Sequence, residues 1–249
     1  MDTLQTSLWR GEFKRLDFTF EGRKAVVVFP RDENRRAEWM LKTEYFNAFQ
    51  NLEHALVKRG MPLAYLENYN RWGTADDLDA KPRFRDFLAR EFGFSGRCVP
   101  IGMSCGGLHA IKLAARHPDT VSCLYLDAPV VNLLSCPFGL GMKSNIGPSA
   151  KEEALNALEI TLSGLLSYRD HPLDSLPALI SSRIPACLVC GDADATVPYP
   201  ENGALVRKAY EKTDIPFLFI LKPGCDHHPH GPDDGDVSRV ADFLIEHSR

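Results

Sequence analysis

The sequence predicts an α/β fold, in which a mostly parallel sheet is covered by helices on both faces. Short apolar segments that suit strands alternate along the chain with longer segments of helical periodicity, as in sheets built from crossover units. The apolar segments VVVF, CLYL and FLFI are nearly continuous, which is typical of strands buried on both faces. We expect residues 1–249 to form a single domain.

The expected elements follow from this pattern in chain order. Strands are expected at residues 13–20, 24–30, 61–69, 98–103, 121–129, 186–192 and 217–224. Helices are expected at residues 38–59, 76–92, 105–117, 201–212 and 234–247. The first helix depends on apolar side chains near helical spacing, namely Trp39, Met40, Tyr45, Phe46, Phe49, Leu52 and Leu56. Gly60 and Pro118 end two of these helices, because glycine favours a helix C-terminus and proline cannot continue a helix.

One segment interrupts the alternation. Residues 130–184 lie between two expected strands and exceed what a simple crossover needs. They begin with the proline- and glycine-rich stretch SCPFGLGMKSNIGPS and continue with the helical stretch KEEALNALEITLSGLLSY. We expect a cap over the C-terminal edge of the sheet, and a crossover with a long loop is the alternative.

Composition excludes several classes of function. A hydrophobic content of 44%, a charged content of 25% and a net charge of −4 are ordinary for a soluble protein and predict no nucleic-acid or membrane partner. We find no signal peptide and no apolar run long enough to span a bilayer. The seven cysteines, four of them in strand-like runs, are expected to be reduced, which favours a cytoplasmic location. The sequence leaves a homodimer open.

The stretch CVPIGMSCGGLHA contains the pattern G-x-S-x-G between an expected strand and an expected helix. In such a turn the central serine is held on a strained backbone, and Gly102 and Gly106 provide the room that the turn requires. Ser104 is therefore the candidate nucleophile. The backbone N–H of Cys105, at the start of the helix, is the candidate first oxyanion donor.

A serine nucleophile needs a base and an orienting acid, which follow it in the order acid, then histidine. The loop GDADATVP after the strand at 186–192 offers Asp192 and Asp194, and Asp127 ends an earlier strand. Asp192 is expected to hydrogen-bond the turn itself. Asp194 lies deeper in the loop and is the candidate acid, whereas Asp127 is expected to line the pocket.

The loop KPGCDHHPHG after the last expected strand supplies the base. His227 is the first histidine after the glycine turn and is the candidate general base, with His228 as the alternative. The side chains of Cys225, Asp226, His227, His228 and His230 are all potential metal ligands. We nevertheless expect no metal site, because His227 and His228 are adjacent and no second ligand cluster has a recognisable spacing.

These three motifs, in this order, resemble the α/β-hydrolase superfamily. GMSCGG resembles the nucleophile elbow, GDADATVP resembles the acid loop G-x-x-D-x-x-V-P, and PGCDHH resembles the histidine loop, with Asp226 where glycine is usual. The resemblance favours Asp194 over Asp192 as the acid. It extends to bacterial hydrolases described as prolyl-oligopeptidase-like or carbohydrate-esterase-like, in which an aromatic and a basic residue, here Trp39 and Lys42, follow the first buried strand.

The resemblance implies an α/β-hydrolase fold and hydrolysis of carboxylic esters, with acylated sugars as one candidate class of substrate and no cofactor. Many members have His-Gly after the strand that here is AVVVF, but this chain has Pro30-Arg31. We expect the second oxyanion donor to be a backbone N–H near Arg31, or one nearer Trp39. His228 and four residues at or after strand ends are candidate substrate-binding residues: Trp39, Tyr69, Trp72 and Asp127.

The hypothesis is therefore a serine esterase that prefers small acyl groups, acting through Ser104, Asp194 and His227. The nearest alternatives are a peptidase and a thioesterase. A peptidase is disfavoured because oligopeptidases usually carry a large extra domain. A non-catalytic binding module on the same fold is the alternative from another class, but it would have no reason to keep all three residues.

Overall fold

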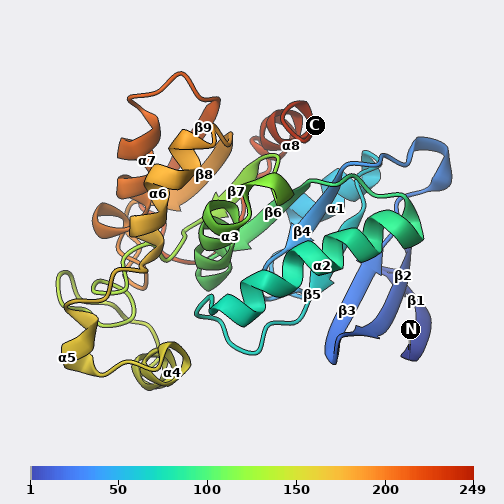
Figure 1. Ribbon diagram of the computed structural model, residues 1–249. Helices are drawn as coiled ribbons and strands as arrows, with labels where there is room; N and C mark the ends of the chain where they lie inside the picture. The colour runs from blue at the N-terminus through green and yellow to red at the C-terminus, as the bar shows by residue number, and fades with distance from the viewer. Residues whose placement is uncertain (1) are drawn as a thin grey trace.

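A nine-stranded mixed sheet forms the centre of the molecule (Figure 1). The structure is a computed structural model and describes residues 2–249. The strands lie in the order β1-β2-β3-β5-β4-β6-β7-β8-β9. The pairs β1–β2, β2–β3 and β3–β5 are antiparallel. All pairs from β5 onwards in this order are parallel. The predicted α/β class is confirmed, with an antiparallel edge added to the parallel sheet.

The elements have the following bounds. The strands are β1 (Asp2–Trp9), β2 (Phe13–Phe20), β3 (Arg23–Val28), β4 (Trp39–Lys42), β5 (Leu63–Leu66), β6 (Cys98–Met103), β7 (Leu124–Asp127), β8 (Ala186–Gly191) and β9 (Phe217–Lys222). The helices are α1 (Asn51–Lys58), α2 (Ala75–Phe92), α3 (Cys105–Arg116), α4 (Ser149–Leu158), α5 (Leu162–Leu165), α6 (Pro172–Ser181), α7 (Gly203–Tyr210) and α8 (Val237–Glu246). None of the helices in residues 2–249 is long and apolar enough to cross a membrane.

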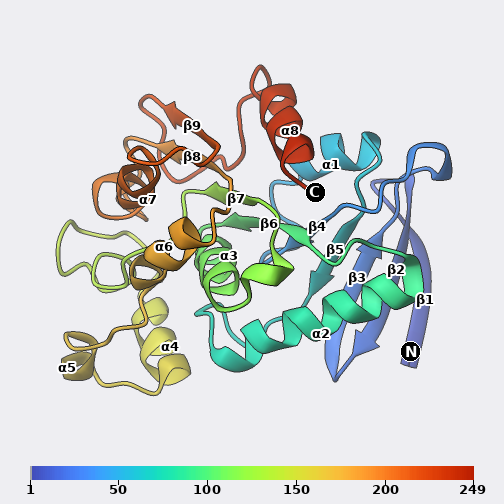
Figure 2. The same cartoon turned by 45° about the horizontal axis from the view of Figure 1, so that its top comes forward.

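Helices cover both faces of the sheet (Figures 1 and 2). α2, α3, α6 and α7 pack on one face, and α1 and α8 pack on the other. Strand β3 shows how the two layers arise. Val27 belongs to the core beneath α2 and α3, whereas Val26 and Val28 belong to the core beneath α1 and α8. Because neighbouring side chains of a strand point to opposite faces, a run of valines supplies both cores at once.

The prediction of one helix over residues 38–59 is wrong. The segment forms strand β4, then an irregular loop, and only then helix α1. Tyr45 and Phe49 in the loop have φ angles of 54° and 47°, which a right-handed helix does not allow. β4 lies between β5 and β6, and all four of its residues are buried. A short strand buried on both faces shows no alternation, so apolar spacing alone could not separate it from a helix.

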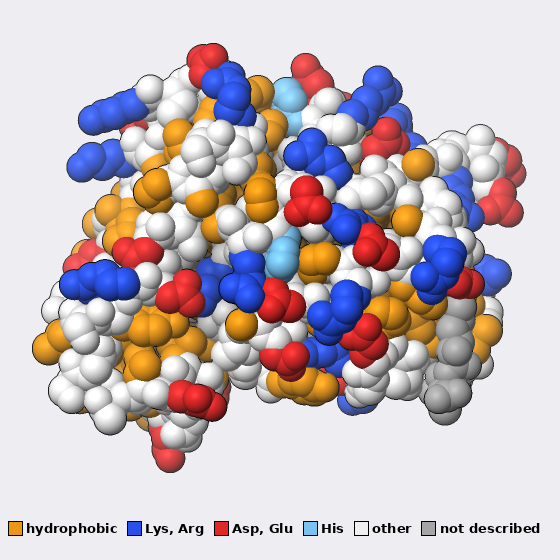
Figure 3. Space-filling model, viewed as in Figure 1, with side chains coloured by type: hydrophobic (Ala, Val, Ile, Leu, Met, Phe, Trp, Pro, Cys, Tyr) orange, Lys and Arg blue, Asp and Glu red, His pale blue; other side chains and the backbone are white. Residues whose placement is uncertain are grey.

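Residues 130–184 divide into two parts. α4 and α5 lie away from the sheet at the lower left of Figure 1, where hydrophobic side chains gather on the surface (Figure 3). Leu140, Met142, Leu162 and Leu166 are the large exposed hydrophobic residues of this region. α6, in contrast, packs into the main core through Leu176 and Leu179. Val131 also packs in the main core, so the part of the segment that projects from the sheet, which we call the cap, is residues 132–171.

Candidate active site

Ser104 lies on a sharp turn between β6 and α3. Its backbone has φ 53° and ψ −121°, a conformation that L-residues rarely adopt. The strand beside it holds the turn in place. Ser104 N–H donates to the Asp127 carbonyl at 2.9 Å, and the Ser104 carbonyl accepts from the N–H groups of Gly107 and Val130 at 3.0 Å each. The strained residue is thus fixed by the end of β7.

Glycines are needed around Ser104 because neighbouring atoms leave no room for a Cβ atom. A Cβ on Gly102 would lie 2.5 Å from the Gly106 carbonyl oxygen, and one on Gly107 would lie 2.5 Å from the Pro129 side chain. Real Cβ atoms do not approach other atoms that closely. A Cβ on Gly106 would lie 3.0 Å from the Thr43 hydroxyl, which itself donates to the Gly106 carbonyl at 2.7 Å. The turn can form only with small residues at these positions.

The structure brings together the three residues predicted to form the triad. Ser104 Oγ lies 3.1 Å from His227 Nε2, and His227 Nδ1 lies 2.7 Å from Asp194 Oδ2. The second oxygen, Asp194 Oδ1, accepts from the N–H groups of Thr196 and Val197 at 2.9 and 2.7 Å. The His227 and Asp194 side chains are buried. With the Nδ1 proton directed at Asp194, His227 Nε2 is free to accept the Ser104 proton.

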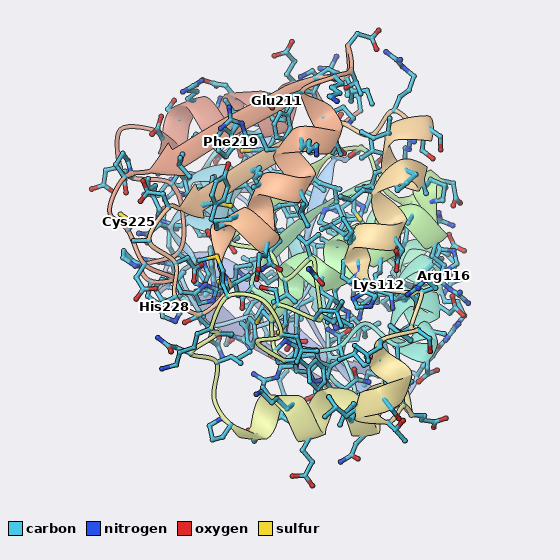
Figure 4. All side chains as sticks on the ribbon, turned by 90° about the vertical axis from the view of Figure 1, so that its left-hand side faces the viewer. Lys112, Arg116, Glu211, Phe219, Cys225 and His228 are labelled. Atoms are coloured by element: carbon cyan, nitrogen blue, oxygen red, sulfur yellow. The ribbon has the colours of Figure 1, made fainter. Side chains whose placement is uncertain are left out.

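The acid and histidine loops are fastened to each other. Asp226 Oδ1 accepts from the N–H groups of Ala195 and His227 at 2.9 and 2.7 Å. Asp192 Oδ1 accepts from the Gly224 N–H at 2.6 Å, so Asp192 binds the neighbouring loop and not its own turn as predicted. Cys225 and His228 of the histidine loop lie on the same side of the molecule, with the cap below them (Figure 4). Asp226, where a glycine was expected, therefore orients the base.

The loop after β4, and not the segment at Arg31, approaches the nucleophile. The second oxyanion donor was predicted near Arg31 or nearer Trp39, and the position near Arg31 was wrong. Arg31 lies instead in a separate groove with Leu8, Glu12 and Phe13, where it pairs with the Glu12 carboxylate at 3.5 Å. The loop that reaches Ser104 contains Tyr45, whose side chain interacts with the Cys105 and Arg71 side chains. Burial, with the neighbouring Cys105, raises the pKa of the Tyr45 hydroxyl, so this group stays a hydrogen-bond donor.

A cavity of about 290 Å³ opens over Ser104. Its wall consists of Tyr45, Ala48, Phe49, Arg71, Met103, Ser104, Cys105, Ile146, Thr196, His227, His228 and His230. Burial raises the pKa of the Cys105 thiol to about 11, so this neighbour of Ser104 is uncharged at neutral pH and is not a competing nucleophile. The cavity wall is mainly apolar, and its polar groups are the Arg71 guanidinium, the three imidazoles and the hydroxyl-bearing residues Tyr45, Ser104 and Thr196.

A second histidine–aspartate pair lies beside the triad. His230 Nδ1 is 3.0 Å from Asp127 Oδ1, while Asp127 Oδ2 accepts from the Gly231 N–H at 2.5 Å and the Tyr125 hydroxyl at 3.1 Å. Burial by itself would raise the pKa of Asp127, but His230 and the Gly231 N–H hold it below its ordinary value. Asp127 was predicted to line the pocket. It is buried beneath the wall, and His230 occupies that place.

The prolyl oligopeptidase family matches residues 63–248, which is most of the chain and includes all three triad residues. The chain belongs to the prolyl oligopeptidase family. It is a serine hydrolase of the α/β-hydrolase type, as the resemblance implied. The strands β1 to β4 lie before the matched region. β1 to β3 form the antiparallel edge of the sheet, and the loop that follows β4 carries Tyr45.

Solved structures show the same fold at low sequence identity. A puromycin hydrolase has a TM-score of 0.67 at 18% identity and covers 94% of this chain. The dipeptidyl peptidase 4 of Porphyromonas gingivalis has a TM-score of 0.68 at 18% identity and covers 95%. This chain spans only 39% and 35% of those two proteins. An S-formylglutathione hydrolase from Agrobacterium tumefaciens has a TM-score of 0.64 at 15% identity, with 98% of this chain and 97% of that one covered.

Three predicted substrate-binding aromatics of this prolyl oligopeptidase family member are not in the cavity wall. Trp39 and Trp72 are 1% exposed and pack in the core, where Trp39 Nε1 donates to the Ser95 carbonyl at 2.9 Å. Tyr69 is exposed, but its ring stacks on the Arg23 guanidinium at 3.6 Å, outside the cavity wall. Of the predicted binding residues only His228 lines the cavity, stacked on Phe49 with ring centres 5.4 Å apart.

Sequence reasoning missed Tyr45, Phe49 and Arg71. The first two were taken for the apolar face of a helix that does not exist. Arg71 follows β5, and its position after a strand end was the available signal.

Proposed function

We propose that this protein hydrolyses carboxylic esters with short acyl groups through a covalent acyl-enzyme on Ser104. The observation that supports this most strongly is the hydrogen-bonded row from Asp194 through His227 to Ser104, at 2.7 and 3.1 Å, at the floor of a cavity. A serine hydroxyl is a weak nucleophile at neutral pH, and this arrangement is what activates it.

In the first half of the reaction, Ser104 Oγ attacks the ester carbonyl carbon while His227 Nε2 takes the hydroxyl proton. Asp194 holds the imidazole and stabilises its positive charge. The tetrahedral intermediate collapses when the C–O bond to the alcohol breaks and His227 gives its proton to the leaving oxygen. Water then attacks the acyl-enzyme by the same route, which releases the acid and restores Ser104.

Two donors are proposed for the oxyanion. The Cys105 N–H belongs to the first turn of α3, where N–H groups have no acceptor within the helix. The Tyr45 hydroxyl lies in the same cavity wall, on the loop between β4 and α1. In this fold the second donor comes from the loop that follows the strand next to the nucleophile strand, and β4 is that neighbour of β6. The Tyr45 N–H already donates to the Glu44 carboxylate at 3.3 Å, and the Tyr45 hydroxyl interacts with the Cys105 side chain. We propose the hydroxyl because it can rotate its proton from Cys105 to the oxyanion.

The preference for short acyl groups rests on the size of the cavity. A volume of about 290 Å³ lies at the lower end of small-molecule sites, and Ile146 of the cap narrows it. Trp39 and Trp72, two of the aromatic residues predicted to bind substrate, lie in the core and cannot stack on a sugar ring. Their burial weakens the case for an acylated sugar as the substrate. The exposed stack of Phe49 and His228 is the aromatic surface that remains for the alcohol part of a substrate.

Peptide hydrolysis is the second candidate, because the family and the dipeptidyl peptidase neighbour favour it. Both functions are tested with p-nitrophenyl esters from acetate to octanoate and with dipeptide p-nitroanilides, using wild type and Ser104→Ala. We expect wild type to hydrolyse the acetate best and Ser104→Ala to fall to background. Turnover of the anilides at kcat/KM values above those of the esters would favour the peptidase, and no turnover of either would contradict both.

A further inference from the structure

Three imidazole side chains meet at the cavity mouth. Candidate ligand atoms of His227, His228 and His230 lie within 4.8 Å of one another. Their ring centres are 4.6 Å apart for His227 and His230, and 5.0 and 4.9 Å for the pairs that include His228. The adjacency of His227 and His228 was the reason to expect no metal site, but the loop brings His230 to both of them. The mechanism proposed above uses only His227.

Two of these rings have a carboxylate partner on Nδ1. His227 Nδ1 lies 2.7 Å from Asp194, and His230 Nδ1 lies 3.0 Å from Asp127. Both pairs are buried, with side-chain exposures of 5% or less. A carboxylate on Nδ1 fixes the tautomer in which Nε2 carries the free lone pair. This is the usual outer-sphere partner of a histidine that binds zinc.

From this geometry we propose that the three histidines form a zinc site that inhibits the enzyme reversibly. The ligands are Nε2 of His227, Nε2 of His230 and one ring nitrogen of His228, and water completes a tetrahedron. Neutral imidazoles select zinc and related transition metals over magnesium and calcium, which prefer oxygen ligands. The carboxylates of Asp127 and Asp194 balance the charge of the ion.

Zinc binding requires the imidazole rings to come closer together, and His228 is the ring that can move. Zinc–nitrogen bonds of about 2.0–2.1 Å in a tetrahedron place ligand nitrogens closer together than 4.8 Å, so at least one ring must move. His227 and His230 are held by their carboxylates, whereas His228 is exposed and is held by ring contacts with Phe49, His227 and His230. We therefore assign the movement to His228.

Zinc binding would stop acyl transfer for a direct chemical reason. The lone pair on His227 Nε2 that accepts the Ser104 proton would be shared with the ion, and the proton would have no acceptor. No bond of the protein is broken, so a chelator should restore the activity. This inference adds a regulatory site to the proposed function, and metal binding can be measured without any substrate.

The test is a titration of chelator-treated protein with ZnCl₂ by isothermal calorimetry, supported by the visible spectrum of tetrahedral Co²⁺. We expect one equivalent of zinc to bind to wild type. His228→Ala should weaken binding at least ~10-fold without unfolding, since its side chain is exposed. His230→Gln should do the same, with thermal melting used to check its fold. The matched control is His247→Gln, at a histidine that directly follows α8 and is not among the three proposed ligands, which should bind zinc like wild type.

The outcomes separate this inference from the proposed function. Absence of zinc binding, or binding that His228→Ala and His230→Gln leave unchanged, would overturn the zinc site even if the ester assay succeeds. Zinc binding with these variant effects would support the site even if no ester is hydrolysed. Where esters are hydrolysed, zinc should abolish the turnover and EDTA should restore it.

Discussion

Single side chains decide the chemistry at Ser104, and Tyr45 is the least expected of them. Tyr45 stands at φ 54° on a loop that apolar spacing suggested to be helical. Its hydroxyl shares the cavity wall with Ser104 and Cys105. We expect Tyr45→Phe to lower kcat roughly 100-fold and to change KM little, because an oxyanion donor acts in the transition state. Steady-state kinetics on p-nitrophenyl acetate measure this, and an unchanged kcat would exclude the hydroxyl as the donor.

The buried imidazole of His109 is expected to make the free energy of unfolding depend on pH. It is fully buried in α3, its Nε2 lies 3.2 Å from the Asn70 carbonyl, and its Nδ1 has no hydrogen-bond partner among residues 2–249. Burial, with the nearby Lys81, lowers the pKa of His109, so the folded protein keeps it neutral. The unfolded chain takes up a proton near pH ~6.5. The unfolded state therefore binds more protons below that pH, and the free energy of unfolding falls as pH falls.

We expect the titration of His109 to lower the free energy of unfolding by at most ~1.4 kcal/mol per pH unit, the limit for uptake of one proton. His109→Gln keeps an N–H donor for Asn70 and removes the titration. Urea unfolding from about pH 7 to about pH 5 should show a smaller loss of stability in this variant than in wild type. Equal losses in the two proteins would show that His109 does not titrate as proposed.

At the scale of elements, a buried ion pair joins β4 to α1. Lys42 Nζ contacts the Glu53 carboxylate, and both side chains are 2% exposed. Lys42 was noted for its resemblance to a basic residue of related hydrolases, and the structure gives it a partner on the helix. Removing one charge would leave the other buried and unpaired.

We expect Glu53→Ala to lower the free energy of unfolding by ~3–5 kcal/mol. The double variant Lys42→Met, Glu53→Leu should recover much of that loss, because it leaves no unpaired charge. Chemical denaturation measures both. A double variant as unstable as Glu53→Ala would mean that the loss comes from packing and not from the charge.

The strands and helices that the sequence predicted well carry clear local signals. GMSCGG falls between β6 and α3 as expected, and GDADATVP and PGCDHH follow β8 and β9. β4 was missed because its four buried residues show no periodicity of their own. The expected donor near Arg31 came instead from the family pattern, in which His-Gly follows the strand that here is AVVVF. Tyr45 could not be found before β4 was placed next to β6, because strand order is a property of the whole sheet.

At the scale of the whole molecule, the cap and the sheet share the cavity. Ile146 comes from the cap, whereas Ser104 and Cys105 lie where the central strand β6 ends and α3 begins. Arg71 joins the two parts, because its guanidinium lies 2.6 Å from Glu153 on α4. Partly exposed ion pairs of this kind contribute little to the free energy of unfolding. We therefore expect the Arg71–Glu153 pair to act mainly on the position of the cap.

Under the proposed esterase function, we expect the cap to set the acyl length that the cavity accepts, because Ile146 lines the cavity. We expect Ile146→Ala to raise the kcat/KM ratio of butanoate to acetate roughly 10-fold, because it makes room for added methylenes. Ile160→Ala is the matched control, since Ile160 packs in the cap but does not line the cavity. A ratio that changes equally in both variants would show that general loosening of the cap, and not cavity volume, sets the preference.

We propose above that Ser104 is a nucleophile activated by His227 and Asp194, and intact-protein mass spectrometry after treatment with a fluorophosphonate, which reacts with activated serines, tests this role. We expect one adduct on wild type, none on Ser104→Ala and a much slower reaction of His227→Gln. An adduct on Ser104→Ala, or none on folded wild type, would show that Ser104 is not the activated nucleophile.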